Sequence, residues 1–187
     1  IIGGGHETFY GHYLGARQAF SGKIAIVNLD AHFDLRDETP SSGTMFHQIL
    51  SADNEVDYYC LGLQPQGNTK TLYDTADKFG VKYYSIDEMR NTDAADKVAE
   101  ALQGYDAVLM TLCMDSLQQA IAPGVSAPSP NGYTAVEIHE LVSKFAALRN
   151  LKSFDVSEVS PPLDINDQTS ATAASIIYKF LTVRQSI

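Results

Sequence analysis

The chain has 187 residues, of which 44% are hydrophobic and 10% aromatic, as is typical of a soluble globular protein with a substantial core. Its 13 basic and 23 acidic residues give a net charge of −10, which argues against nucleic acid or an anionic membrane as the main partner. No apolar stretch reaches membrane-spanning length. Both cysteines, Cys60 and Cys113, fall within predicted strands, so we expect no disulfide framework, a reducing compartment and a cytoplasmic location.

Short apolar runs alternate with helical patterns along the chain. In chain order they predict a helix at 8–20, a strand at 23–29, a helix at 45–52, a strand at 56–63, a helix at 68–79, a strand at 81–86, a helix at 94–102, a strand at 107–112, a helix at 134–148, a strand at 152–156 and a helix at 169–183. Thr134 and Glu137 have the spacing of a capping box. The proline- and glycine-rich residues 123–132 predict an ordered loop, because so much rigid and apolar sequence is unlike a linker.

Strand followed by helix, repeated, favours an α/β fold with three layers, α/β/α, around a mainly parallel sheet. No internal repeat or low-complexity tract interrupts this order, so we expect one domain over residues 1–187. The chain opens on Ile1 and Ile2, which have the pattern of the tail of a strand.

Asp30, His32 and Asp34 alternate directly after the apolar run 23–29. In an extended backbone, side chains two residues apart point the same way, so this pattern would aim all three groups at one point above the sheet. Two carboxylates and an imidazole converging there favour a bound cation. The alternative is a helix-capping loop with solvated carboxylates and a partly buried histidine.

Three further segments place similar side chains after apolar runs, and they favour the cation site. Residues 1–7 end in glycines and His6, and residues 110–115 close a strand with Cys113 and Asp115. Residues 153–159 deliver Glu158 after one more apolar start. Ligands and substrates of open α/β sheets gather at the carboxyl ends of the strands, so we expect these side chains to meet.

The chain resembles the ureohydrolase superfamily of arginases, agmatinases and formimidoylglutamases, and within it the formimidoylglutamase branch. The motifs that carry the resemblance follow one another in the same order over nearly the whole chain, at residues 3–7, 11–13, 29–36, 41–44, 122–130 and 155–161. The resemblance implies hydrolysis of a guanidino or amidino C–N bond with a pair of manganese ions. It also implies a considerable segment before the Gly-Gly-x-His motif, so the chain is expected to be truncated at its N-terminus, with an exposed sheet edge and a tendency to associate.

By resemblance, one Mn²⁺ is held by His6, Asp30 and Asp34, and the other by His32, Asp30 and Asp115, with Asp30 bridging the ions. The family pattern has a further bridging carboxylate where this chain has Cys113. A thiolate is a softer ligand that suits zinc, iron or copper better than manganese. Three outcomes follow: Cys113 bridges two metals as a thiolate, it leaves a weaker one-metal site, or the site holds no ion. A small buried apolar role for Cys113 is the alternative to any ligand role.

The resemblance also assigns roles in catalysis and specificity. A water between two cations becomes a hydroxide near neutral pH and attacks the amidine carbon, while Asp115 passes its proton to the leaving nitrogen. Glu158 pairs with the amidinium. Arg36, Ser41 and Ser42 would receive a substrate carboxylate, which favours N-formimidoyl-L-glutamate, hydrolysed to L-glutamate and formamide in histidine degradation, over agmatine; arginine stays open.

The other histidines are not assigned to the reaction. A proton-shuttling histidine of arginase type would fall near Phe46, and His47 lies one position late, a rotation of about 100° on a helix. His12 and His139 are expected in packing or at the surface. The second hypothesis for the whole chain is a non-catalytic homologue, or folded fragment, that keeps the scaffold for assembly; a homo-oligomer is expected from the family resemblance in either case.

Overall fold

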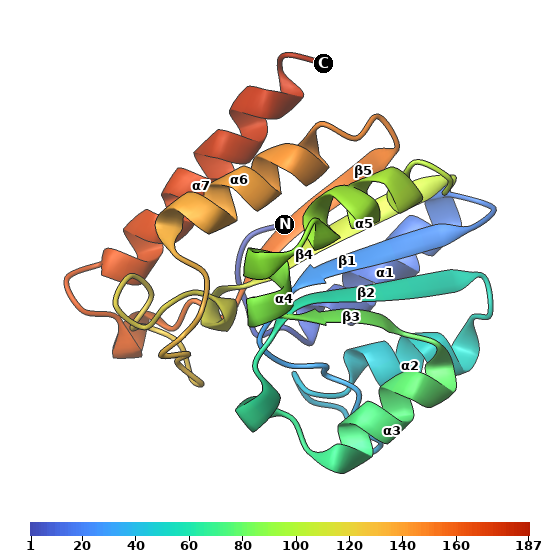
Figure 1. Ribbon diagram of the computed structural model, residues 1–187, viewed down its shortest axis with the longest axis horizontal. Helices are drawn as coiled ribbons and strands as arrows, with labels where there is room; N and C mark the ends of the chain where they lie inside the picture. Colours follow the sequence, from blue (N-terminus) through green and yellow to red (C-terminus); the bar gives the residue numbers. More distant parts are fainter.

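The computed structural model describes residues 1–187 and contains a five-stranded parallel sheet with helices on both faces (Figure 1). This arrangement confirms the predicted three-layer α/β/α fold. All four strand pairs are parallel, and the order across the sheet is β3-β2-β1-β4-β5. The strands are β1 (Ile24–Leu29), β2 (Val56–Leu63), β3 (Lys82–Ser85), β4 (Ala107–Cys113) and β5 (Leu151–Ser157).

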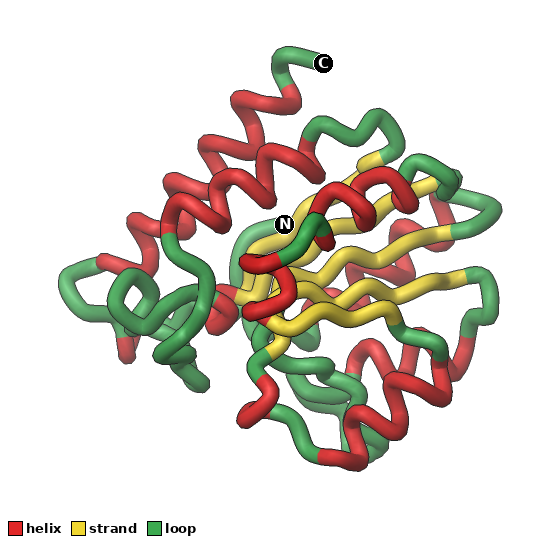
Figure 2. The backbone as a smooth tube through the Cα atoms, viewed as in Figure 1, coloured by secondary structure: helices red, strands yellow, loops and turns green.

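Helices connect the strands and cover the sheet, as the tube in Figure 2 shows. None of them is both long and apolar enough to cross a membrane. The helices are α1 (Thr8–Ala19), α2 (Met45–Ala52), α3 (Lys70–Phe79), α4 (Ile86–Asn91), α5 (Ala94–Leu102), α6 (Ala135–Ala146) and α7 (Gln168–Arg184), with short 3₁₀ turns η1 (Pro65–Gly67), η2 (Met114–Ser116) and η3 (Pro161–Leu163).

The central strand β1 is buried along its whole length and divides the core into two. Ala25, Val27 and Leu29 face the core beneath α5, α6 and α7, whereas Ile24 and Ile26 face the core covered by α1, α2 and α3. In Figure 1, α1 accordingly lies behind the sheet and α5 in front of it. A strand buried on both faces reads as a continuous apolar run, which is why residues 23–29 were recognisable as a strand.

The structure differs from the predicted elements mainly at their ends and in one short helix. The strand predicted at 81–86 ends at Ser85, and Ile86 begins α4 instead. Ser85 caps this helix with a capping box, since its side chain accepts from the backbone N of Glu88 and the Glu88 carboxylate accepts from the backbone N of Ser85. The Ser-x-x-Glu spacing is the local signal for this helix, and the aromatic residues directly before it suit a strand.

The first three residues extend alongside the edge strand β5. Ile2 forms an isolated parallel bridge with Val156, and Gly3 N donates to Val156 O at 2.9 Å. Ile1 and Ile2 therefore pair with the sheet at its carboxyl edge, in keeping with the strand tail predicted for them. Their side chains are 63% and 74% exposed.

Glu137 joins the start of α6 to the loop that precedes it. Its carboxylate accepts from the backbone N of Thr134 and from Arg90, and Arg90 also donates to Asn131 Oδ1 and Gly132 O. The hydrogen bonds from Arg90 hold the pKa of Glu137 at about 2. The predicted capping box of Thr134 and Glu137 is thus confirmed and is part of a wider ion pair.

The Glu137→Gln variant is expected to be less stable than the wild type by about 1–2 kcal/mol at pH 7, the sum of a helix cap and a surface ion pair. Because folding lowers this pKa, the stabilisation is fully present above the ordinary value of 4.5 and is lost as the pH falls toward 2. The stability difference between the two proteins should therefore shrink over that range in urea unfolding. Glu140→Gln, an exposed position on the same helix, is the matched control and should change stability by less than about 0.5 kcal/mol. A stability difference that stays constant from pH 5 to pH 2 would contradict the lowered pKa of Glu137 in the folded chain.

Candidate metal and substrate site

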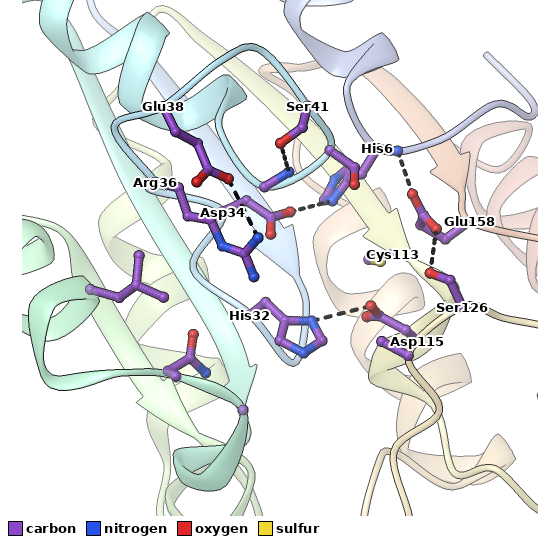
Figure 3. Close-up of a pocket in the computed structure, with 16 residues that line it drawn as sticks. His6, His32, Asp34, Arg36, Glu38, Ser41, Cys113, Asp115, Ser126 and Glu158 are labelled. Carbon is purple, nitrogen blue, oxygen red and sulfur yellow. Dashed lines mark hydrogen bonds and ion pairs between the residues drawn. The ribbon is translucent and has the colours of Figure 1, made fainter.

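Side chains from four separate segments meet at the carboxyl edge of the sheet (Figure 3). Asp30 follows β1, Cys113 ends β4 with Asp115 in the next turn, Glu158 follows β5, and His6 lies in the loop before α1. All of them except the buried Asp30 line a cavity of about 360 Å³. It is lined by His6, His32, Asp34, Arg36, Glu38, Ser41, Ser42, Gly43, Gly67, Asn68, Leu72, Cys113, Asp115, Ser126, Ala127 and Glu158.

Asp30 lies at the centre of the polar cluster and is fully buried. Its Oδ1 accepts from the backbone N of His32 at 2.8 Å, and its Oδ2 accepts from Asn28 Nδ2 at 3.0 Å. His6 Nδ1 lies 3.1 Å from Asp30 Oδ2 and 2.9 Å from Asp34 Oδ2. His32 Nδ1 lies 3.6 Å from Asp30 Oδ1 and 3.2 Å from Asp115 Oδ2. Asp30 therefore contacts both histidines.

The pKa shifts in this cluster show a strongly negative local field. Burial alone would lower the pKa of His32, but its pairing with Asp115 and Asp30 raises it to about 11. Burial would also lower the pKa of His6, but its hydrogen bonds with Asp30 and Asp34 raise this pKa well above the ordinary value. Burial, followed by the charge of Asp30, raises the pKa of Asp34 to about 7. Such a field favours any bound cation.

The side chains of Asp30, His32 and Asp34 gather at one site, but the backbone of this segment is not extended as predicted. The expectation of an extended Asp-x-His-x-Asp segment is wrong, because residues 31–32 form a bend and Asp34 has a left-handed φ of 51°. Glu158 is also left-handed, with φ 71°. Non-glycine residues adopt this conformation at a cost, and such residues cluster at functional sites. Both side chains line the cavity.

Two sets of potential ligand atoms lie close enough to hold a cation each. One set is His6, Asp30 and Cys113, the other is Asp30, His32 and Asp115, and the atoms within each set are within 4.8 Å of one another. In addition, Asp115 Oδ1 is buried without a hydrogen-bond partner. A buried carboxylate oxygen is costly when unpaired, so this atom fits a metal site. The residues present therefore fit a pair of divalent cations that share Asp30.

The family resemblance implied a ligand set of His6, Asp30 and Asp34. In the structure Cys113 completes the set with His6 and Asp30, and Asp34 lies beside it, next to His6. The thiol is 2% exposed. Burial, and then the charges of Asp115 and Asp30, raise its pKa well above the ordinary value. Cys60 is also buried, and neither cysteine forms a disulfide, as predicted.

The cavity lining also includes the predicted substrate-binding residues Arg36, Ser41 and Ser42. Arg36 Nη1 lies 3.5 Å from Glu38 Oε1, and both side chains are more than half exposed. Across from Arg36 in Figure 3, Glu158 Oε1 accepts from the backbone N of His6 at 2.8 Å, and Ser126 donates to Glu158 Oε2 at 3.3 Å. Arg36 and Glu158 thus face one cavity from different elements.

Among the lining residues that were not identified from the sequence, three have polar side chains: Glu38, Asn68 and Ser126. Asn68 accepts from the backbone N of Phe33 and donates to Ala31 O, so it holds the segment that carries His32. Its position after the Pro-Gln-Gly turn gave no recognisable signal. Ser126 lies in the loop 123–132, whose order was predicted but whose contact with Glu158 depends on tertiary structure.

The remaining histidines lie outside the cavity lining, in agreement with their not being assigned. His47 packs edge-to-face against Phe79, with ring centroids 5.3 Å apart. His139 bonds Ala135 O and Ser175 on the outer helices. His12 is nearly buried and bonds Asp155 Oδ2 at 2.7 Å.

The chain matches the model of the arginase family over residues 1–182. A formimidoylglutamase of Lysinibacillus sphaericus is 47% identical over 97% of this chain and 59% of its own length, and one of a Geobacillus species is 46% identical over 97% and 58%. The chain thus spans about three fifths of the length of the curated relatives it matches.

Solved structures agree with this similarity. The crystal structure of formimidoylglutamase from Bacillus subtilis superposes with a TM-score of 0.93 at 27% identity, over 99% of this chain and 60% of that one. A Trypanosoma cruzi formiminoglutamase variant with Mn²⁺ has a TM-score of 0.89 at 23% identity, over 98% and 63%, and at that identity it supports the fold alone.

Proposed function

The chain belongs to the arginase family, and from this premise we propose that it carries the metal-binding and catalytic part of a hydrolase that cleaves an amidine C–N bond, with N-formimidoyl-L-glutamate as the substrate. The observation that carries the proposal is the pair of ligand sets sharing buried Asp30 at a cavity that also exposes Glu158 and Arg36. A homo-oligomer, from the family resemblance, and a cytoplasmic location, from the two free cysteines, are part of the proposal.

Divalent cations, with Mn²⁺ as the proposed ion, would be held by two groups of side chains that share Asp30: His6 and Cys113 on one side, with Asp34 adjacent, and His32 and Asp115 on the other. Bound cations of this kind lower the pKa of water enough to make it a nucleophile near neutral pH. The carboxylates of Asp30 and Asp115 support this choice of ion, because oxygen ligands suit manganese.

Glu158 and Asp115 have separate roles in this proposal. Glu158 is fixed by the backbone N–H of His6, so its carboxylate can pair with the cationic amidinium and hold the carbon in one position. Asp115 has one oxygen beside His32 and one without a partner, so it can accept the proton of the attacking water and return it to the leaving nitrogen. The C–N bond to the glutamate nitrogen breaks, the amidine carbon keeps the water oxygen as formamide, and the protonated amine leaves as L-glutamate.

Arg36 supports a substrate with carboxylates over one with a cationic end. A guanidinium binds a carboxylate with two parallel hydrogen bonds, and agmatine has no carboxylate to offer. The relatives named formimidoylglutamase support the same choice. Arginine has one carboxylate and is the competing substrate.

The second candidate function is a non-catalytic homologue, and Cys113 is the observation that favours it. A thiol in place of a hard oxygen ligand weakens the case for manganese. Against this candidate, the chain keeps a cluster of three carboxylates and two histidines in which Asp30, Asp115 and His6 are buried, an arrangement that is costly without a cation.

Metal titration followed by a substrate panel separates the two candidates. The purified 187-residue chain is titrated with MnCl₂ by calorimetry, its metal content is measured, and the release of glutamate from formimidoylglutamate is compared with the hydrolysis of arginine and agmatine. The proposal predicts two ions per chain and preference for formimidoylglutamate. Absence of bound ions after manganese loading would rule out the catalytic function, and preference for arginine or agmatine would overturn the substrate.

Replacing Arg36 by Gln is expected to raise KM for formimidoylglutamate about tenfold with little change in kcat, because a charge-assisted contact made equally in ground and transition states is lost. The matched variant Glu38→Gln removes the neighbour that pairs with Arg36 and should lower KM. Steady-state kinetics of both variants provide the measurement. An unchanged KM in Arg36→Gln would show that the substrate carboxylate binds elsewhere.

A further inference from the structure

A buried chain of hydrogen bonds runs from His6 away from the cavity and into the core. His6 Nε2 lies 2.9 Å from Thr111 Oγ1, Thr111 donates to Asp155 Oδ1 at 2.6 Å, and Asp155 Oδ2 lies 2.7 Å from His12 Nδ1. The His6, Thr111 and Asp155 residues are at most 2% exposed, and the His12 side chain is 7% exposed. The four residues come from the loop before α1, from β4, from β5 and from α1, respectively.

The direction of these hydrogen bonds follows from which groups can donate and which can only accept. A carboxylate oxygen only accepts, so the single hydroxyl hydrogen of Thr111 goes to Asp155. Thr111 Oγ1 then has only lone pairs for His6, and it must accept from His6 Nε2–H. The other nitrogen, Nδ1, faces Asp30 and Asp34. The chain thus assigns the two nitrogens of His6 different roles.

We propose that Thr111 and Asp155 are positioning residues that keep the hydrogen of His6 on Nε2 and aim Nδ1 at a cation in the cavity. This inference rests on the proposed function, since it requires a metal ion beside His6. An imidazole ligand is a better and more directional donor when its second nitrogen is held by a hydrogen bond that ends on a carboxylate. Here a threonine hydroxyl relays that contact from Asp155 to His6.

His12 gives independent support to the role of Asp155, because burying a histidine is unfavourable unless its hydrogen bond to Asp155 compensates for the cost. Its Nδ1 donates to Asp155, but its Nε2 is buried without any hydrogen-bond partner. The ring packs edge-to-face on Phe9, with centroids 5.2 Å apart, so an apolar side chain would suit the same place without the unpaired nitrogen. We therefore assign His12 the role of fixing the Asp155 carboxylate.

The arrangement is one-sided, and this makes the inference testable. The second ligand set contains His32, which is 27% exposed at its side chain and has no such chain behind it. Loss of the Thr111 hydroxyl should thus weaken the binding of the ion beside His6 and leave the binding of the ion beside His32 largely unaffected. General damage to the fold would weaken the binding of both ions.

The test is calorimetric titration of Thr111→Val with MnCl₂, against the wild type and Thr111→Ser. We expect one of the two manganese ions to bind about 10–100-fold more weakly in Thr111→Val, the other to keep its affinity, and Thr111→Ser to behave like the wild type. Thr169→Val is the matched control, since Thr169 is equally buried but accepts from Gly124 N instead. Its two manganese affinities should be those of the wild type.

A spectroscopic measurement checks the assignment of the nitrogens directly. In the wild type loaded with Zn²⁺, the ¹⁵N shifts of His6 should report a protonated Nε2 and a metal-bound Nδ1. Metal bound at Nε2, equal affinities in Thr111→Val and the wild type, or equal weakening of both ions would each overturn the inference. If the wild type itself binds no ion, the proposed function fails; if it binds two and Thr111→Val binds them equally well, only the positioning role fails.

Discussion

Asp30→Asn is expected to abolish the binding of both metal ions and with it the hydrolysis of formimidoylglutamate. Asp30 belongs to both ligand sets and is the carboxylate that both histidines contact. A neutral amide binds Mn²⁺ much more weakly than a carboxylate does, so each affinity should fall by more than about a hundredfold, the upper end of the cost of losing an outer partner alone. Calorimetric titration with MnCl₂ measures both affinities.

The variant should still fold, because its amide oxygen can keep the contact with the backbone of His32, while only the hydrogen bond from Asn28 Nδ2 is lost. Its oxygen can accept from the backbone N of His32 as the carboxylate does. Asp53→Asn is the matched control: Asp53 pairs with Arg17 and Tyr13, and it does not line the cavity. It should lower stability but leave metal binding intact. Retention of one tightly bound ion in Asp30→Asn would contradict the shared role of Asp30.

Cys113→Asp is expected to raise the affinity for Mn²⁺ about tenfold or more and to increase the rate of hydrolysis. A hard oxygen ligand replaces a soft sulfur ligand beside His6 and Asp30, which shifts the preference of the site from zinc toward manganese. The same substitution adds a fourth carboxylate near Asp30, Asp34 and Asp115, so it should lower the melting temperature of the metal-free protein. Relative to the wild type, the melting temperature of Cys113→Asp should therefore be lower without MnCl₂ and higher with it, as measured by thermal unfolding.

Cys113→Ala separates the loss of the thiol from the gain of a carboxylate. This variant should lose affinity for Zn²⁺ without gaining affinity for Mn²⁺. If Cys113→Asp changes neither the manganese affinity nor the rate, the carboxylate at this position does not contribute to the site. If Cys113→Ala retains the zinc affinity of the wild type, the thiol is a packing residue.

Much of the fold could be predicted from the sequence, because the central strands β1 and β4 are buried on both faces and helix α6 begins at a local capping signal. The run 23–29 and the Thr134–Glu137 spacing are examples in which local pattern and tertiary structure agree. Helix α4 was missed because it has six residues and follows an aromatic run that suits a strand equally well. The spacing of Ser85 and Glu88 is the local signal that could have predicted its start.

The candidate site was predictable in its residue types and unpredictable in its geometry. Strand ends brought His6, Asp30, His32 and Asp115 together as parallel topology requires. The left-handed backbone of Asp34 and Glu158 is imposed by tertiary contacts, and nothing in the local sequence specifies it. The same holds for Thr111, which contacts His6 from 105 residues away.

The contact between His6 and Glu158 joins residues 152 positions apart and has a consequence for folding kinetics. The cavity can close only after β4 has paired with β1 and β5 with β4, so we expect it to form late in folding. Ions that bind only the closed cavity stabilise the native state without stabilising the folding transition state. Metal loading should accordingly lengthen the lifetime of the folded chain by slowing its unfolding, while the refolding rate stays the same.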